Sequence, residues 1–201
     1  IRSSAASDVY KRQAMTFAAG LACEGKKPVL AIYSTFLQRA YDQLIHDVAI
    51  QNLDLLIAID RAGLVGEDGA THSGIFDLSF MRCIPNLIIM TPSSEEECWR
   101  LLETGYKFEG PAAVRYPKGF GLGTDLPTEF EEIEIGKSKE IKFSETNKIS
   151  ILSFGSMLSL SDDISKDLDA NLIDMRFVKP LDTSCIIKCA NHSELIVTLE
   201  D

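Results

Sequence analysis

Short, continuous apolar runs are the feature that most restricts how this chain of 201 residues can fold. Four such runs recur in its first part, at 28–33, 55–59, 87–91 and 112–116. A run of about 4–8 apolar residues between turn residues is typical of a strand that is buried on both faces. Helical patterns separate the four runs, and strands that alternate with helices form a parallel sheet. The sequence therefore predicts an α/β fold in which a parallel sheet is flanked by helices.

Apolar spacing and capping residues place the helices between these strands, at 14–23, 34–49, 76–83 and 94–106. The second of these has one apolar stripe at three- and four-residue spacing, after a serine that can cap its start. The last begins at Ser94 and carries three glutamates in its first turn, where the helix dipole favours negative charge.

A second, shorter α/β unit follows, with strands predicted at 149–154, 171–177 and 195–199 and helices at 158–168 and 183–190. Between the two units, 122–147 is predicted to be a linker with a short antiparallel hairpin, and its acidic run 129–134 a solvated strand edge. We therefore expect a first domain at 14–121, a linker or hairpin at 122–147, and a truncated second domain at 148–201.

Both ends of the sequence are interpreted as cut. Residues 1–13 have no apolar periodicity, and we expect a non-native or junction segment there. The sequence stops just after the apolar run 195–199, without a closing helix. The chain is therefore predicted to be an internal fragment of a longer protein.

Composition excludes some classes of function. A net charge of −10 argues against a nucleic-acid partner, which would require a basic surface. The sequence has no apolar run of the roughly 20 residues that a membrane span needs. The five cysteines form no CxxC pair, so buried reduced thiols are expected rather than a zinc site.

The polar, glycine-rich loop Asp60–Gly74 directly follows the second predicted strand. Ligands of open α/β sheets bind beyond the carboxyl ends of the strands, where this loop begins. The loops at that edge together supply Tyr33, Phe36, Arg39, Arg61, Asp68, His72 and Lys118. Cations suit a phosphate or carboxylate ligand, and a histidine beside a carboxylate can transfer protons. The residues alone leave open that Tyr33 and Phe36 are core aromatics and that Asp60 only ends its strand.

Six sequence blocks in this order carry a family resemblance: Thr16–Ala22, Tyr33–Gln43, Asp60–Gly66, Asp68–Gly74, Met90–Ser93 and Val114–Gly119. Together they closely resemble the 1-deoxy-D-xylulose-5-phosphate synthase family, thiamine diphosphate enzymes of the transketolase superfamily. Asp174–Asp182 looks like the start of that family's third domain. The likeness runs from about Ala14 to Asp201 and implies a pyrimidine-binding domain followed by part of a C-terminal domain.

The resemblance implies roles for six residues of this sequence. It implies cofactor binding by Phe36 and Tyr33, catalysis by Asp68 and His72, and substrate binding by Arg61, Lys118 and Tyr33, with no metal ligand. Phe36 would stack on the aminopyrimidine ring of the cofactor, and the two cations would hold the substrate phosphate. Lys118 stands where the family usually has arginine, so it keeps the charge but loses the bidentate fork.

The implied reaction is condensation of pyruvate with glyceraldehyde 3-phosphate with loss of CO2, the first step of non-mevalonate isoprenoid synthesis and a source for thiamine synthesis. The implied cofactors are thiamine diphosphate and Mg2+, whose ligands would lie in a missing N-terminal domain. The family also implies a homodimer, located in the bacterial cytoplasm or in the plastid stroma of a plant or alga. The fragment alone is expected to be inactive.

One position departs from the family. The family has Glu-Gln-His-Ala where this sequence reads Lys11-Arg12-Gln13-Ala14, so Lys11 takes the place of the glutamate that activates the cofactor. We expect Lys11 to belong to the non-native segment. Two alternatives stay open: another superfamily enzyme, such as a transketolase or the beta subunit of a 2-oxo acid dehydrogenase, or a non-catalytic fragment.

Overall fold

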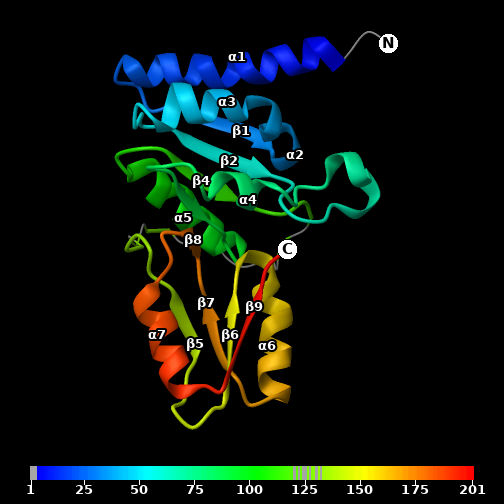
Figure 1. The fold of residues 1–201 in the computed structure, drawn as a ribbon, viewed down its shortest axis with the longest axis vertical. Helices are drawn as coiled ribbons and strands as arrows, with labels where there is room; N and C mark the ends of the chain where they lie inside the picture. The colour runs from blue at the N-terminus through cyan, green and yellow to red at the C-terminus, as the bar shows by residue number, and fades with distance from the viewer. Residues whose placement is uncertain are drawn as a thin grey trace.

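The computed structural model describes residues 4–119, 121, 123, 126, 128, 129, 131 and 133–201, with side chains from Val9 onward. Two α/β units lie end to end, each built on its own sheet (Figure 1). The first unit contains α1 (Ser4–Cys23), β1 (Val29–Tyr33), α2 (Ser34–Leu37), η1 (Gln38–Ala40), α3 (Tyr41–Gln43), η2 (Leu44–Ala49), β2 (Leu56–Asp60), η3 (Gly66–Asp68), η4 (Ala70–His72), α4 (Asp77–Met81), β3 (Ile88–Met90), α5 (Glu95–Lys107) and β4 (Ala112–Arg115). The second contains β5 (Lys139–Lys142), β6 (Ile149–Ser153), η5 (Gly155–Met157), α6 (Leu158–Asp167), β7 (Asn171–Asp174), β8 (Phe177–Lys179), α7 (Thr183–His192) and β9 (Leu195–Leu199).

The first sheet has the order β1-β2-β4-β3-β8. Its first four strands are parallel, as the alternation of strands and helices predicts, and β8 joins β3 in the antiparallel sense. The register pairs Tyr33 with Asp60 and Ile59 with Arg115, so the carboxyl ends of three strands meet at one edge. This edge carries the glycine-rich loop.

Helices cover both faces of the first sheet. On one face, α1 and the helical segment 34–49 bury their apolar side chains against β1, β2 and β3. On the other face α5 packs closely, because a Cβ on Gly105 would lie 2.8 Å from the Met90 side chain and 2.9 Å from that of Leu56. These two layers fix the strand ends from which the loops leave.

The second sheet has the order β5-β7-β6-β9, with β7, β6 and β9 parallel. Buried residues of α7 pack on one cluster of this sheet, and α6 contributes partly buried residues to another. The C-terminal end of β9 comes back toward the first unit (Figure 1). The second unit therefore meets the same edge of the first unit that bears the loops after β3 and β4.

Several elements differ from the sequence-based expectation. In 122–147, β5 pairs antiparallel with β7 of the second sheet rather than in a local hairpin. The single strand expected at 171–177 is divided at Arg176, whose φ is 54°, and β8 crosses to the first sheet. The acidic run 129–134 lies in part outside the described residues, at positions 130 and 132.

The helical segments also depart from their predicted regularity. The apolar stripe of 34–49 is buried as expected, but the segment mixes α, 3-10 and π turns. Helix α1 begins at Ser4 and continues through residue 13 without a break. Cys185 and Cys189 are buried as expected, whereas Cys23 and Cys83 are exposed. No helix of the described residues is long and apolar enough to span a lipid bilayer.

Candidate active site

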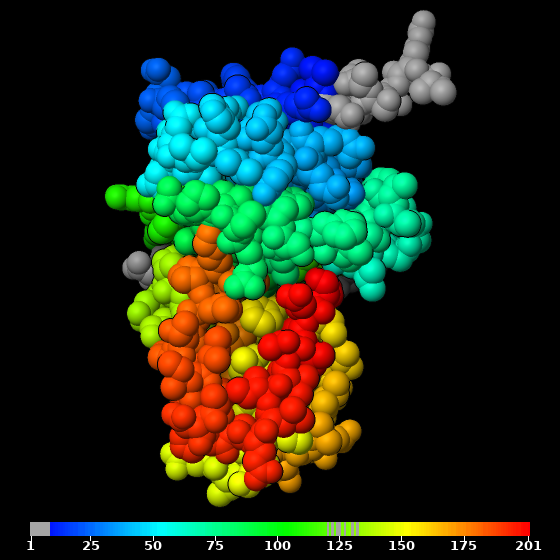
Figure 2. Space-filling model, in the orientation of Figure 1, coloured from blue at the N-terminus to red at the C-terminus, as the bar shows by residue number. Residues whose placement is uncertain are grey.

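The glycine-rich loop, Asp60–Gly74, is closed on itself and projects from one side of the first unit (teal in Figure 2). Gly63 and Gly74 form an antiparallel bridge, with N–H···O distances of 2.9 and 2.8 Å. Only glycine fits at position 74, since a Cβ there would lie 2.3 Å from the Arg61 carbonyl oxygen and 2.5 Å from the Ser34 Cβ. The loop is therefore held at its base while its middle remains at the surface.

A buried ion pair supports the base of the loop. Arg115 Nε donates to Asp77 Oδ2 at 2.9 Å, and Arg115 NH2 donates to the Gly74 carbonyl at 3.3 Å. Asp77 also accepts from the Leu78 N–H at 2.9 Å, which fixes the start of α4. The strand end, the loop and the following helix are thus joined by one guanidinium group. This pair was not predicted from the sequence.

Aromatic rings from the end of β1 and from α2 lie against the loop. The Tyr33 and Phe36 rings are stacked, with 5.3 Å between centroids and 12° between planes. Arg61 lies over the Tyr33 ring, with its Cζ 3.9 Å from the ring centroid. The His72 ring meets Phe36 edge to face at 5.5 Å. Four of the residues predicted to form a site therefore make a continuous chain of contacts, from Arg61 through Tyr33 and Phe36 to His72.

Charged groups of the loop and of the segment after β4 form one group, here called the loop-edge cluster: Asp60, Arg61, Glu67, Asp68 and Lys118. Arg61 Nε donates to Asp68 Oδ2 at 3.1 Å, and Lys118 Nζ donates to Asp68 Oδ1 at 2.7 Å. The remaining carboxylates complete the group, with Arg61 NH1 to Asp60 at 2.7 Å and Lys118 to Glu67 at 3.1 Å. The two predicted phosphate-binding cations therefore share one carboxylate.

The shared carboxylate stays ionised. The hydrogen bond from Lys118 lowers the pKa of Asp68, and the hydrogen bond from Arg61 lowers it further against the effect of partial burial. The hydrogen bond to Asp68 in turn raises the pKa of Lys118. Asp68 is therefore a hydrogen-bond acceptor and a fixed negative charge in this arrangement, not a proton donor.

His72 is oriented from one side of its ring. Its Nδ1 lies 3.1 Å from the Thr71 hydroxyl, and Thr35 Oγ1 donates to the Thr71 carbonyl at 3.1 Å. These contacts leave Nε2 as the ring nitrogen that could face a ligand. Thr35 and Thr71 were not anticipated as site residues, although both lie within blocks that carry the family resemblance.

Lys11 also reaches this site, from α1. Its Nζ lies 3.7 Å from the Phe36 centroid and 5.5 Å from the Tyr10 centroid. The side chain is buried, although the two residues that follow it are exposed. Lys11 thus covers part of the ring that the family resemblance assigns to cofactor stacking.

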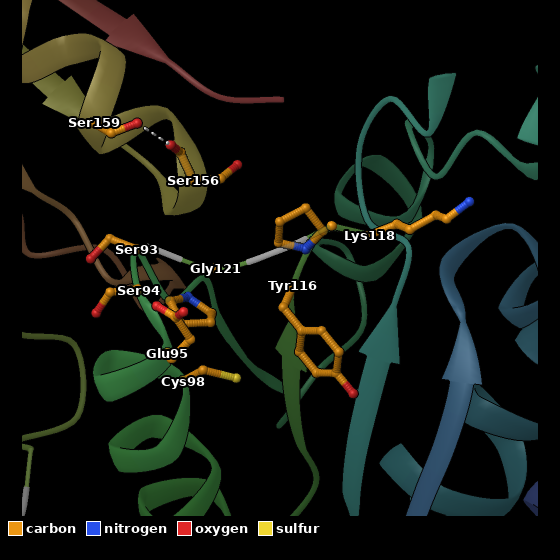
Figure 3. Close-up of a pocket in the computed structure, with 12 residues that line it drawn as sticks. Ser93, Ser94, Glu95, Cys98, Tyr116, Lys118, Gly121, Ser156 and Ser159 are labelled. Carbon is orange, nitrogen blue, oxygen red and sulfur yellow. Dashed lines mark hydrogen bonds between the residues drawn. The ribbon is translucent and has the colours of Figure 1, made fainter. Parts of the chain in front are cut away.

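A separate cavity of about 380 Å³ opens between the two units. It is lined by Pro92, Ser93, Ser94, Glu95, Cys98, Tyr116, Pro117, Lys118, Gly119, Gly121, Ser156 and Ser159. The Lys118 ammonium points away from the serine side chains (Figure 3), so only the stem of this residue lines the space. Burial, and then the charge of Glu95, raises the pKa of Cys98 to about 11, so its thiol is protonated and poorly reactive. The helix start at Ser94 was predicted from the sequence, whereas this cavity was not.

Two curated relatives of this chain carry the same name. A "1-deoxy-D-xylulose-5-phosphate synthase" from Francisella tularensis subsp. novicida (strain U112) is 57% identical over 193 residues, which cover 96% of this chain and 31% of that protein. The protein of the same name from Histophilus somni (strain 2336) is 62% identical over the same shares. The chain therefore spans about a third of the length of the curated relatives it matches.

Solved structures agree on the fold. The one described as "Split gene transketolase, inactive beta4 tetramer" matches with a TM-score of 0.80 and 25% identity, over 95% of this chain and 63% of that one. A transketolase from Campylobacter jejuni matches with a TM-score of 0.67 and 17% identity, over 87% of this chain and 31% of that one. The second likeness shows the fold alone.

Family models divide the chain as its two units suggest. "Transketolase, pyrimidine binding domain" matches residues 12–121, and "Transketolase, C-terminal domain" matches residues 138–201. The first match alone covers more than half of the sequence and includes every residue of the loop-edge cluster. The chain therefore belongs to the transketolase family.

Proposed function

We propose that a full-length protein containing this sequence is a 1-deoxy-D-xylulose-5-phosphate synthase. Such a protein condenses pyruvate with glyceraldehyde 3-phosphate with loss of CO2, as the first step of non-mevalonate isoprenoid synthesis. The names of the relatives at 57% and 62% identity support this substrate pair over a ketose donor, since the transketolase-named structures are at most 25% identical. The observation that carries the proposal is that two cations share the Asp68 carboxylate beside a stacked aromatic pair, which the His72 ring contacts edge to face.

The substrate phosphate is assigned to Arg61 and Lys118. Both cations already bind the single carboxylate of Asp68. A phosphate dianion offers more charge and more acceptor oxygens than that carboxylate, so it can compete for both cations. Binding of the phosphate would then release Asp68 toward the hydroxyl groups of the same substrate.

Proton transfer is assigned to His72. Its Nδ1 is held by Thr71, so Nε2 is the nitrogen that would exchange a proton with a substrate oxygen. Tyr33 and Phe36 form the apolar wall that would keep water from this side of the substrate.

Thiamine diphosphate is the cofactor that the family relationship supports, with Mg2+ bound by ligands that we place outside this sequence. Phe36 is the residue we assign to its aminopyrimidine ring. The Lys11 nitrogen at 3.7 Å from the Phe36 centroid does not fit a ring stacked on that face. We further propose a homodimer in the cytoplasm, or in the stroma if the source is a plant or alga. We also propose a first domain at 14–121 and a truncated second domain at 148–201, joined by a linker or hairpin at 122–147.

A product assay tests the proposal directly. A full-length protein containing this sequence, incubated with pyruvate and glyceraldehyde 3-phosphate, is expected to form 1-deoxy-D-xylulose 5-phosphate, measured by mass spectrometry. Transfer only from a ketose donor would assign the protein to the transketolases instead. Oxidative use of a 2-oxo acid by a partner complex would assign it to the 2-oxo acid dehydrogenases. No turnover of any of these would favour a non-catalytic protein.

A further inference from the structure

Lys11 is placed as a buried cation on an aromatic ring, which is an uncommon position for lysine. Only 5% of the residue is exposed, and its Nζ lies 3.7 Å from the Phe36 centroid. Arg12 and Gln13, the next residues of α1, are exposed, so the helix turns Lys11 alone of the three toward the ring. A desolvated ammonium over an aromatic face is held by the negative charge of that face.

The ammonium occupies the space that a stacked ring would need. Stacked aromatic rings have centroids about 4.5–7 Å apart. The Lys11 nitrogen at 3.7 Å lies inside that distance, and Tyr33 already takes one stacked position at 5.3 Å. A flat ligand can therefore reach the ring face under Lys11 only when this side chain moves away.

The charge of Lys11, like its bulk, disfavours a cationic ring at Phe36. The two stacked rings already have a cation at each ring, Arg61 on Tyr33 and Lys11 on Phe36. A positively charged heterocycle at Phe36 would meet the Lys11 charge in addition to losing the space. A neutral ring that displaces the ammonium avoids the charge repulsion and gains the space over Phe36. Removal of the lysine gives any flat ring the same access.

We propose that Lys11 is an internal competitor that occupies the stacking face of Phe36 and sets the affinity of this chain for flat nitrogen heterocycles. The choice of an aminopyrimidine as the heterocycle rests on the function proposed above. The occlusion itself rests on the contact between the two side chains. Removal of the Lys11 side chain is therefore expected to strengthen binding, although a lysine is lost from a buried position.

The contact can be measured without any ligand. In the 201-residue chain, the Hε protons of Lys11 should be shifted upfield by the ring current of Phe36, as measured by NMR. Phe36→Leu should abolish the shift. Hε protons at ordinary lysine positions in the unchanged chain would show that the ammonium does not lie over the ring, and would overturn the proposal.

The competition is measured with 4-amino-5-hydroxymethyl-2-methylpyrimidine, a neutral aminopyrimidine, titrated into the same chain. Lys11→Ala should bind it at least about fivefold more tightly than the unchanged chain, because no cation–π contact has to be broken. Lys11→Met, which keeps the length of the side chain without its charge, should fall between the two. Arg12→Ala loses the same charge from an exposed neighbouring position, and its affinity should stay within about twofold of the unchanged chain.

Equal affinity of Lys11→Ala and the unchanged chain would overturn the proposal, and so would an absence of binding to both. An equal gain in affinity for Arg12→Ala would assign the effect to net charge and would also overturn the proposal. The outcome is separate from that of the proposed function. Tighter binding by Lys11→Ala together with no product in the full-length assay would retain the occlusion and reject the synthase activity.

Discussion

Two groups of charged side chains lie near the carboxyl edge of the first sheet, and they differ in burial. The loop-edge cluster is half-buried, with the side chains of Arg61, Asp68 and Lys118 exposed by 21, 23 and 29%. The second group joins the two units and is here called the interunit network: Ser93, Glu97, Asp174 and Arg176. In that network the Glu97 side chain is 7% exposed and Asp174 is 1% exposed.

The difference in burial gives the two groups opposite electrostatics. In the loop-edge cluster the hydrogen bond from Lys118 lowers the pKa of Asp68, so its charge is stable and open to exchange with a ligand. In the interunit network burial raises the pKa of Asp174 to about 6, against the hydrogen bond from Ser93 Oγ at 2.7 Å. Paired charges at a sheet edge thus indicate a ligand site only where solvent, and hence a ligand, can reach them.

The largest effect is expected at the buried pair beneath the loop, which belongs to neither group. Asp77→Ala leaves the guanidinium of Arg115 buried, with its Nε partner removed. Breaking a buried ion pair in this way destabilises a protein by about 3–5 kcal/mol. We expect a loss of that size in the free energy of unfolding of the 201-residue chain, measured by urea denaturation.

The matched control is an exposed pair. Asp162→Ala removes the partner of Lys166 on α6, where the two side chains are 44% and 62% exposed. The expected loss is below about 1 kcal/mol. Similar losses for Asp77→Ala and Asp162→Ala would mean that burial does not determine how much an ion pair of this molecule contributes to its stability.

The next effect concerns the pH dependence of the interunit network. The pKa of Asp174 is about 6 in the folded chain, above the ordinary value of 3.8. The folded chain therefore holds the proton more tightly than the unfolded chain does. The resulting contribution to stability is complete below pH 4 and is lost as the pH rises through 6. Asp174→Asn should therefore stabilise the chain by about 3 kcal/mol at pH 8, with the gain vanishing near pH 4. Urea denaturation at both pH values measures it.

Asp182→Asn is the control with the opposite sign. Burial would raise the pKa of Asp182, but hydrogen bonds from Ser184, Cys185 and Ser138 outweigh it and hold the pKa at about 2. In the folded chain this carboxylate is ionised throughout between pH 4 and 8, and in the unfolded chain it takes up a proton only below about pH 5. Its replacement should cost about 1 kcal/mol by weakening the cap of α7, and this cost should be constant from pH 8 to 5 and slightly smaller at pH 4. A pH-independent effect of Asp174→Asn as well would contradict the raised pKa of Asp174.

The sequence predicted the strands well because each is a local pattern. The runs at 28–33, 55–59, 87–91 and 112–116 lie within one or two residues of β1, β2, β3 and β4. Pairings between distant segments were not predicted. The division at Arg176 depends on a positive φ, which no local sequence pattern predicts. Strand β5 pairs with β7, and the whole of β6 lies between them in the sequence, so no local pattern predicts this pairing either.

The candidate site was predicted in part. Loop position and the family resemblance together led to Tyr33, Phe36, Arg61 and His72, which the structure brings into contact. The ion pair of Arg115 was missed because an arginine at the end of an apolar run looks like a strand terminus. The contact of Lys11 with Phe36 was missed because it joins two helices whose packing only the folded chain defines.

A third prediction tests the loop as a site of chemistry. In the full-length protein, His72→Ala should lower kcat by about tenfold or more, since general acid–base groups contribute at least that factor. The fold should be unchanged by circular dichroism, because the His72 side chain is only half-buried. His46→Ala is the control, as its side chain is 80% exposed outside the site. Equal activity of both variants would remove His72 from the mechanism.

The smallest effect is expected at the outer cation of the loop-edge cluster. Lys118→Arg keeps the charge beside Asp68 and adds a second parallel donor, so a phosphate should be held in the bidentate manner that lysine cannot offer. In the full-length protein the KM for glyceraldehyde 3-phosphate should fall by about two- to fivefold at unchanged kcat. The KM for pyruvate, which lacks a phosphate, should not move. Equal changes in both KM values would mean that Lys118 acts on the shape of the loop rather than on the phosphate.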